Sequence, residues 1–354
     1  LLSDAAPGIR GAEIRALALV DPETFLTALS GMDPDRDWTV RVAQADALAT
    51  LPGPQGAPRL ISMLQDRDPR VVPAVLRALA AAKAPDVQRL LTDRLKADDF
   101  VVRETAAGIL ADMKATPAVP ALVDAYRATA GDGTYVARAA MLTALNALDP
   151  PTARPLLQGA LRDPDWALRV KAATLLRDQG VTDTAVAIRP APARPMDDAE
   201  WRALLAPQFS PHAFIETDKG IIEIELAILD APLTVSNFMA LARKGFFNGL
   251  AIHRIVPDFV VQDGDPRGDG DGGPGYTIRD ELNEQPYLRG TVGMALDWKD
   301  TGGSQFFITH SPQPHLDARY TVFGHLVSGI DVVDRLQPWD VIRRVQIWDG
   351  TTLR

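Results

Sequence analysis

The sequence predicts a multidomain protein in which an all-α solenoid is followed by a closed, mainly antiparallel β-barrel with two capping helices. Leucines recur every 31 or 35 residues through the first half, prolines cluster between the halves, and the apolar periodicity changes from helical towards two after Phe209. We therefore expect a helical repeat domain over residues 1–188, a proline-rich linker over 189–208 and a β-rich domain over 209–354.

The composition limits the classes of function. The chain has 354 residues, of which 46% are hydrophobic and 23% are charged, as in globular proteins, and no apolar run is long enough to span a bilayer. Because cysteine is absent, disulfides, thiolate metal sites and a cysteine nucleophile are excluded. The net charge of −9 argues against nucleic acid as the main partner, since phosphate binding needs a basic patch.

The cellular compartment stays open. The chain begins at Leu1 without a methionine or a signal-like segment, so we expect a processed or trimmed product. This start and the absence of cysteine favour an exported protein of the bacterial periplasm or cell envelope, with the cytoplasm as the alternative. The composition does not decide between the two.

The repeat is defined by leucines and arginines at fixed spacing. The leucines Leu17, Leu48, Leu79, Leu110, Leu145 and Leu176 are each preceded, seven residues earlier, by Arg10, Arg41, Val72, Arg103, Arg138 and Arg169. A second series consists of Leu29, Leu60, Leu91, Leu122 and Leu157. Both series contain one interval that is four residues longer than the others, and we assign the insertion to a loop at 130–133.

Each unit is predicted to form two helices. Acidic residues precede the first helix and can cap its start, as at 66–69, and the second helix often begins near proline, as at Pro58. A single helix pair cannot bury its apolar face, so about six stacked units between residues 3 and 188 would form a solenoid. The pattern Asp-x-x-Val-Arg-x-x-Ala-x-x-x-Leu resembles HEAT-like repeats of the short bacterial kind. Since residues 1–10 resemble the middle of a unit, the sequence leaves open whether more repeats lie upstream.

Two features of the repeats have alternative interpretations. An aromatic residue occupies one position in four units, namely Trp38, Phe100, Tyr135 and Trp166. A platform for stacking bases would need exposed aromatics among basic residues, but a constant place at a helix start favours packing in the core or between repeats. For the arginine series, we expect pairing with the preceding aspartates between units, and a binding surface is the alternative.

The second domain is predicted from alternation and turns. Residues 222–226 alternate apolar and polar, and residues 212–217 are the expected hairpin partner across 218–220. Residues 232–244 form an amphipathic helix that ends at Gly245, and residues 330–336 suggest a second short helix. Further strands are expected at 251–255, 259–262, 291–295, 305–309, 321–323 and 341–348. Many short strands with two helices fit a closed barrel, which removes exposed edges.

Three blocks of this domain resemble cyclophilin-type peptidyl-prolyl isomerases. They are Ile252-His253-Arg254-Ile255-Val256-Pro257-Asp258-Phe259-Val260-Val261-Gln262-Asp263-Gly264-Asp265, Gly303-Ser304-Gln305-Phe306-Phe307-Ile308, and His315-Leu316-Asp317-Ala318-Arg319-Tyr320-Thr321-Val322-Phe323-Gly324. The blocks follow the family's order, and the resemblance covers roughly residues 210–352. It implies a rotation of X–Pro bonds in proline-containing protein clients, for which no metal and no cofactor is needed.

The resemblance implies a role for each of several residues. Arg254 would donate a hydrogen bond to the prolyl nitrogen, Gln262 would hold Arg254 in place, and Phe259 would complete the catalytic group. The implied binding residues are Val260, Ala295, Leu296, Gln305, Phe307, His315, Leu316 and Tyr320. Gln305 and the backbone of Ala295 and Leu296 would hold the neighbouring peptide units. The proline pocket would consist of Phe259, Val260, Phe307 and Leu316, and His315 and Tyr320 are further binding positions.

Several positions depart from the family's pattern. His315 stands where tryptophan is frequent, Tyr320 where histidine is frequent, Ile252 where an aromatic is usual and Leu296 where asparagine is frequent. Because that tryptophan often supports binding of cyclosporin, the resemblance implies weak sensitivity to the drug.

Three further motifs resemble functional sites but lack features that those sites require. The loop 264–275 lacks the order of an EF-hand and carries too many acids for a phosphate cradle, so we expect a tight surface loop beside the cleft. His253 lacks a partner at metal-ligand spacing and is expected to hydrogen-bond within the barrel. Ser304 lacks the Gly-x-Ser-x-Gly elbow of a serine hydrolase.

The sequence thus predicts a peptidyl-prolyl cis-trans isomerase whose helical repeats bind a protein partner or client. The alternative is a scaffold that docks proline-containing segments with little or no turnover, which the changes at Leu296, His315 and Tyr320 keep open. A third hypothesis makes the repeats the main functional part and the isomerase domain an accessory. The sequence names neither the client nor the residue preferred before proline, and it leaves the oligomeric state open.

Overall fold

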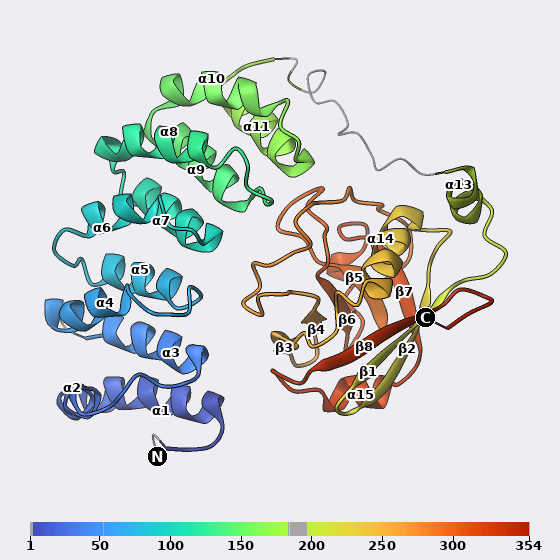
Figure 1. Cartoon of the computed structure of the whole chain (residues 1–354), viewed down its shortest axis with the longest axis horizontal. Coiled ribbons are helices and arrows are strands. Elements are labelled where there is room, and N and C mark those ends of the chain that lie inside the picture. Colours follow the sequence, from blue (N-terminus) through green and yellow to red (C-terminus); the bar gives the residue numbers. More distant parts are fainter. Residues whose placement is uncertain (1–2, 52, 183, 185–196, 354) are drawn as a thin grey trace. The chain divides into compact units, whose positions relative to one another are not determined.

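A computed structural model describes residues 3–51, 53–182, 184 and 197–353 of the chain (Figure 1). The chain divides into two compact units, and each is described by itself. Part of the predicted linker, residues 189–196, lies outside the described residues. Among the helices of the described ranges, none combines the length and apolar character that a bilayer crossing requires.

The first unit consists of helices stacked in pairs (Figure 1). They are α1 (Pro7–Val20), α2 (Pro22–Ser30), α3 (Trp38–Ala49), α4 (Ala57–Met63), α5 (Val72–Ala81), α6 (Val87–Arg94), α7 (Phe100–Asp112), α8 (Val119–Ala128), α9 (Val136–Leu148), α10 (Pro150–Ala160) and α11 (Trp166–Asp178), with short 3-10 helices η1 (Gly53–Gly56) and η2 (Thr116–Ala118). The first turn of α11 belongs to the second unit, which includes residues 164–170. The first helix of each pair lies next to the first helix of the following pair, as α1 does to α3 and α7 to α9.

Local sequence explains where several helices begin. The side chains of Asp21, Asp37, Asp99 and Asp149 accept backbone N–H groups in the first turns of α2, α3, α7 and α10. Both leucine series lie in the core, because Leu48, Leu60, Leu79, Leu91 and Leu110 are fully buried. The predicted helix pairs and their apolar faces are therefore confirmed.

Buried arginines connect four of the units to the unit that follows. Arg41 donates from Nε and Nη2 to the Asp66 carboxylate over 2.7 and 2.9 Å, and only 3% of Arg41 is exposed. Arg10 pairs in the same way with Asp35, and the other pairs are Arg103 with Asp132 and Arg138 with Asp163. The pairing between units was expected, but the carboxylate comes from the loop that starts the following unit. The expected partner, which precedes the arginine's own helix, was wrong.

The unit that lacks the arginine supports the pairing of each arginine with an aspartate of the following unit. The unit with Val72 in place of arginine carries Ala97 where the neighbouring units carry aspartate. Both members of the ion pair are thus absent together, which avoids leaving one buried charge without its partner.

We expect Arg41→Val to lower the free energy of unfolding by about 3–5 kcal/mol, because the Asp66 carboxylate would stay largely buried without its partner. The double variant Arg41→Val with Asp66→Ala copies the natural Val72 and Ala97 pair and should recover most of that loss. Urea unfolding of the intact chain followed by far-UV circular dichroism measures both. An equal loss in the single and double variants would show that the carboxylate does not need the arginine.

The aromatic position of the repeat contributes to packing at Trp38 and at Tyr135. The Arg70 guanidinium lies 4.3 Å from the centre of the Trp38 ring and thereby joins α3 to the loop before α5. Tyr135 is 7% exposed at the start of α9. Both observations agree with the expected packing in the core or between repeats.

The second unit is a curled antiparallel sheet with helices. Its strands are β1 (His212–Thr217), β2 (Gly220–Leu226), β3 (Arg254–Val256), β4 (Val260–Asp263), β5 (Thr291–Met294), β6 (Phe306–Thr309), β7 (Val322–Ser328) and β8 (Ile342–Trp348), in the order β3-β4-β6-β5-β7-β2-β1-β8. The helices are α13 (Asp198–Leu205), which lies within the predicted linker, α14 (Pro232–Arg243), α15 (Ile330–Arg335) and the 3-10 helix η3 (Pro314–Leu316).

The prediction of a closed barrel was wrong, because the sheet is open between β3 and β8. The strand β3 has only three residues, and among the described strands it pairs with β4 alone. The loop before β3 spans the opening instead, with Ala251 bridging Val341 and with hydrogen bonds between Ile252 and residues 339–340. The second unit is therefore a half-barrel, and the backbone of the loop before β3 bridges its opening.

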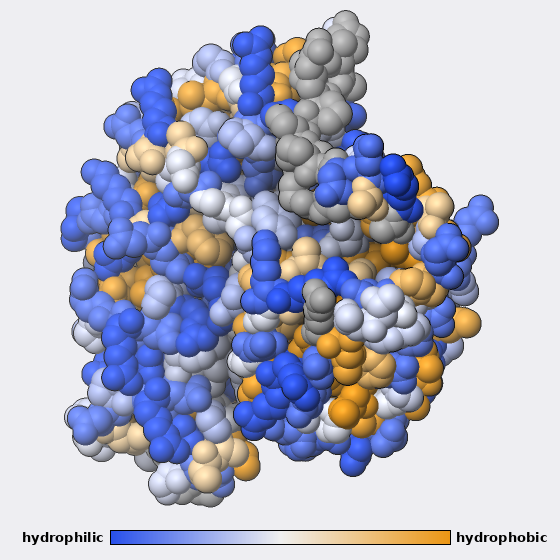
Figure 2. Space-filling model, turned by 45° about the vertical axis from the view of Figure 1, so that its right-hand side comes forward, coloured by the Kyte–Doolittle hydropathy of each residue, from blue (hydrophilic) through white to orange (hydrophobic). Residues whose placement is uncertain are grey.

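The core of the half-barrel follows the predicted alternation. In β2, Ile222 and Ile224 are buried while Ile221 is 55% exposed. Helix α14 contributes Phe238 to this core and α15 contributes Val333, so both predicted helices cover it. Exposed apolar side chains such as Leu229 also occur on this unit, and orange areas interrupt the hydrophilic surface in Figure 2.

Candidate active site

The first part of the site comes from the hairpin β3–β4. Arg254 and Gln262 are direct partners in its register, so both side chains leave the same face. The Arg254 Nη1 donates to the Gln262 Oε1 over 3.0 Å, while the Arg254 side chain remains exposed. The hairpin therefore presents a guanidinium to the solvent and restrains it from one side.

A chain of hydrogen bonds sets the direction of the Gln262 amide. The Gln305 Nε2 donates to the backbone carbonyls of Gly270 and Gly272 over 2.7 and 2.9 Å, which leaves its Oε1 to accept. The Gln262 Nε2 donates to that oxygen over 2.9 Å, so the Gln262 Oε1 faces Arg254. The orientation of the guanidinium thus depends on the glycine-rich loop 264–275. Six residues of this loop are glycines, which have no side chain to block the approach of Gln305.

An apolar cluster lies beside this polar chain. Its buried members are Val260, Tyr287, Phe307, Leu316 and Val322, and the partly buried Phe259, Ala295 and Tyr320 pack against them. Phe307 lies opposite Gln262 in the pairing of β4 with β6, which connects the cluster to the polar chain. The Tyr320 ring meets Phe307 edge-on at 5.8 Å.

The Phe259 ring has the side chains of Arg254 and His315 as neighbours. The Arg254 Cζ is 5.8 Å from the centre of the Phe259 ring, and the His315 ring stacks on Phe259 at 5.7 Å with an angle of 22° between the planes. His315 is exposed, so it forms the outer rim of the cluster where the family often has tryptophan.

Two predicted residues lie at the margin of this arrangement. The Ala295 N–H donates to the backbone carbonyl of Gln305 over 3.0 Å, so this donor is engaged within the protein. The Leu296 side chain packs against the core of the half-barrel and not against the apolar cluster. Leu296 therefore contributes no side chain to the described apolar cluster, and the backbone role expected for it stays a prediction.

The loop 264–275 is organised by its own aspartates. The buried Asp265 carboxylate accepts the backbone N–H groups of Arg267, Asp269 and Gly270. Asp269 in turn pairs with the Arg267 guanidinium over 2.8 Å. In the described part of the chain, no group of three or more His, Asp or Glu side chains is placed to hold a metal ion.

The expectation for His253 was wrong. Neither ring nitrogen has a hydrogen-bond partner among the described residues, and both nitrogens are buried. Burial lowers the pKa of the imidazole, with weaker opposing effects from Asp265 and Asp269.

Sequence reasoning missed Tyr287. It is 1% exposed, and its ring stacks on Phe307 at 5.5 Å with an angle of 25°. A Cβ added to Gly293 would collide with the Tyr287 hydroxyl, so the glycine leaves the space that Tyr287 fills. Since Tyr287 lies in an irregular segment between elements, no periodicity could have indicated its burial.

Sequence reasoning also gave no role to Asp263, the residue after Gln262. Its side chain is 3% exposed, and burial raises its pKa to about 7 against the opposing hydrogen bond from the Gly264 N–H. Among the described residues, its Oδ2 has no hydrogen-bond partner. The only signal in the sequence was the acid itself, at the end of a strand that is otherwise apolar apart from Gln262.

The geometry supports a limited set of reactions. An exposed guanidinium, held in direction by two amides, stands next to an apolar cluster with an aromatic rim. Such a site can bind a small apolar ring and place a permanent cation and hydrogen-bond donors beside it. The surrounding apolar side chains lower the local dielectric constant and thereby strengthen the electrostatic interactions of the guanidinium.

Comparison with known proteins finds one family model that matches the second unit and one that matches part of the helical repeats. A family model described as cyclophilin type peptidyl-prolyl cis-trans isomerase/CLD matches residues 212–349, and one described as HEAT repeats matches residues 26–111 and 58–134. The matches confirm the predicted resemblances over these residues.

Individual relatives match the second unit. A peptidyl-prolyl cis-trans isomerase of Synechococcus elongatus is 48% identical over 137 residues, which is 38% of this chain and 94% of the relative. Peptidyl-prolyl cis-trans isomerase B of Bacillus subtilis is 48% identical over 136 residues, 38% of this chain and 95% of the relative. A solved structure of a Cryptosporidium parvum cyclophilin type isomerase is 31% identical and covers 38% of this chain and 96% of that one, with a TM-score of 0.36.

Proposed function

The chain belongs to the cyclophilin-type peptidyl-prolyl cis-trans isomerases, and we propose that it rotates X–Pro bonds of protein clients at the site formed by Arg254, Gln262 and Phe259. The observation that carries this assignment is the hydrogen-bonded chain from the loop 264–275 through Gln305 and Gln262 to Arg254. It holds one exposed cation in a defined direction beside an apolar cluster.

Catalysis of X–Pro rotation requires mainly a cation that can donate a hydrogen bond to the prolyl nitrogen. Rotation about an X–Pro bond is slow because the amide C–N bond has partial double-bond character, with a barrier of about 18–20 kcal/mol. In the twisted state the resonance is lost and a lone pair localises on the prolyl nitrogen. A guanidinium N–H of Arg254 donates to that nitrogen, so it stabilises the twisted state more than either planar state.

The other residues position the substrate in this proposal. The ring of the substrate proline packs on Phe259, Val260, Phe307 and Leu316, which also exclude water from the reacting bond. His315 and Tyr320 border the ring, and Gln305 with the backbone of Ala295 and Leu296 binds the neighbouring peptide units. Because the Ala295 N–H is engaged within the sheet, its carbonyl is the group left for the substrate.

We also propose that the HEAT repeats bring clients to the isomerase. Stacked helical repeats present extended surfaces suited to binding other proteins. Binding one part of a client there raises the effective concentration of its prolines at the second unit. The domain boundaries at 1–188, 189–208 and 209–354 remain part of this proposal.

The test is NMR exchange spectroscopy of a short Ala-Pro peptide. Accelerated cis–trans exchange is expected with the intact chain and, to a similar extent, with a fragment of residues 197–354, because a short peptide contacts only the second unit. Binding without accelerated exchange would contradict the catalytic role and support a docking module for proline segments. Exchange that needs residues 1–196 would contradict the placement of the site.

A further inference from the structure

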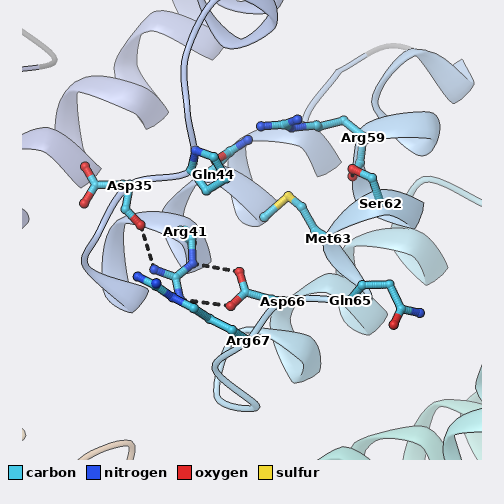
Figure 3. A pocket seen from close by; sticks show the side chains of 10 residues that line it. Asp35, Arg41, Gln44, Arg59, Ser62, Met63, Gln65, Asp66 and Arg67 are labelled. Carbon is cyan, nitrogen blue, oxygen red and sulfur yellow. Dashed lines mark hydrogen bonds and ion pairs between the residues drawn. The ribbon is translucent and has the colours of Figure 1, made fainter.

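The first unit contains a polar pocket of about 380 Å³ in its second repeat. The pocket is lined by α3, by α4 and by the loops that precede α3 and follow α4, as Figure 3 shows. The residues that matter most are Arg41, Gln44, Arg59, Met63, Asp66 and Arg67. We propose that this pocket binds an acidic segment of a client peptide through its carboxylate side chains.

The neighbouring repeats show which lining residues are special to this unit. The position of Gln44 is held by Val75, Ala106, Met141 and Ala172 in the later units, and the position of Arg59 is held by Ala28, Leu90, Ala121 and Leu156. Both positions are therefore apolar in most of the solenoid. Because apolar residues satisfy the fold there, the amide and the guanidinium of the second unit are not required for helix packing.

The two special residues offer unused donors. Gln44 is 6% exposed, and neither its Nε2 nor the Nε of Arg59 has a hydrogen-bond partner within the residues that the structure describes. The Arg59 guanidinium extends towards Gln44 in Figure 3. A buried donor without an acceptor is unfavourable, so an oxygen ligand between these groups would stabilise the pocket.

The charges around the pocket favour an anion. Arg41 is neutralised by Asp66 and Asp35 by Arg10, whereas Arg59 and Arg67 form no ion pair among the described residues. Two uncompensated guanidinium groups thus face one pocket in a chain whose net charge is −9. Arginine forms paired hydrogen bonds with carboxylates, and two such groups are too few for a nucleic-acid backbone.

An extended peptide also fits the remaining lining. Met63 is buried and apolar, so it can pack against the aliphatic part of a glutamate side chain, while the Gln44 amide can donate to a peptide carbonyl. The inference rests on the proposed recruiting role of the repeats. It adds the binding place, which is the pocket of the second repeat, and the chemical class of the ligand, namely acidic segments near the client's prolines.

The experiment measures binding of a fluorescein-labelled, proline-free peptide of alternating glutamate and serine to the intact chain by fluorescence anisotropy. The glutamine counterpart of the peptide is the ligand control. We expect binding of the glutamate peptide only, and a loss of affinity of about tenfold in Arg59→Leu, since one charged hydrogen-bonding group is removed. Gln44→Val should also weaken binding. Both variants use residues that other units carry at these positions.

Arg89→Leu is the matched control, because it removes the same charge from an exposed position of α6 and should leave the affinity unchanged. Equal binding of both peptides, or full affinity in Arg59→Leu with unchanged thermal unfolding, would overturn the proposal. Displacement of the peptide by inorganic phosphate at equal concentration would assign the pocket to free phosphate instead. Exchange of the Ala-Pro peptide, measured on the same samples, should be unaffected in every variant, so failure here is distinct from failure of the isomerase assignment.

Discussion

Replacing Arg254 by alanine is expected to reduce the catalysed exchange of an Ala-Pro peptide by about 100- to 1000-fold, the usual effect of removing one donor aimed at a transition state. The guanidinium is the one group that the hydrogen-bonded chain through Gln262 and Gln305 holds in direction. The apolar cluster remains intact in the variant, so binding of the proline peptide should change much less than its exchange rate.

The same NMR exchange measurement separates charge from geometry. Arg254→Lys keeps the positive charge but loses the rigid fork that contacts Gln262, so an intermediate rate is expected. Arg343→Ala removes a residue of the same charge on β8, which is 60% exposed, pairs with Asp218 and belongs to neither the polar chain nor the apolar cluster, so this variant should exchange at the rate of the unaltered protein. Unchanged exchange in Arg254→Ala would refute the proposed role of the guanidinium.

Replacing Asp263 by asparagine is expected to change the pH dependence of stability. Burial raises the pKa of Asp263 to about 7 in the folded protein, above the ordinary value of 3.8. Between these values the folded state binds a proton that the unfolded state has released, so the stability falls as the pH rises from about 4 to 7. The loss reaches about 4 kcal/mol above pH 7, from three pKa units at about 1.4 kcal/mol each.

The asparagine variant stays neutral and avoids this loss. Urea unfolding between pH 4 and pH 9 should show little difference from the unaltered protein at acid pH and a more stable variant at alkaline pH. Asp349→Asn is the control of opposite sign, because hydrogen bonds from Thr352 and Thr351 lower the pKa of Asp349 to about 2. Asp349 is fully ionised in both the folded and the unfolded state above pH 4, so this variant should be less stable by the same amount throughout the range, and the difference should shrink only below pH 4. An unchanged alkaline stability in Asp263→Asn would show that the carboxylate is accommodated as an anion.

The sequence alone determined the two-part architecture and most of the site. The 31-residue spacing of Leu48 and Leu79 needs only local helix geometry and stacking of like units, and the alternation of Ile222 and Ile224 needs only the two-residue period of a strand. Arg254 and Gln262 were placed in one site through the resemblance, and their hairpin confirms that they are neighbours. The leucine spacing and the strand alternation recur along the chain, so they can be recognised without knowledge of the tertiary structure.

The tertiary structure decided everything that depends on which distant groups meet. It assigned the Arg41 guanidinium to Asp66 of the next unit, left the sheet open where the short strand β3 reaches no partner beyond β4, and placed Tyr287 against Phe307 from an irregular segment. It also buried Asp263, whose carboxyl looks in the sequence like any other surface acid. Burial and partner choice arise from packing between elements, and no local period encodes them.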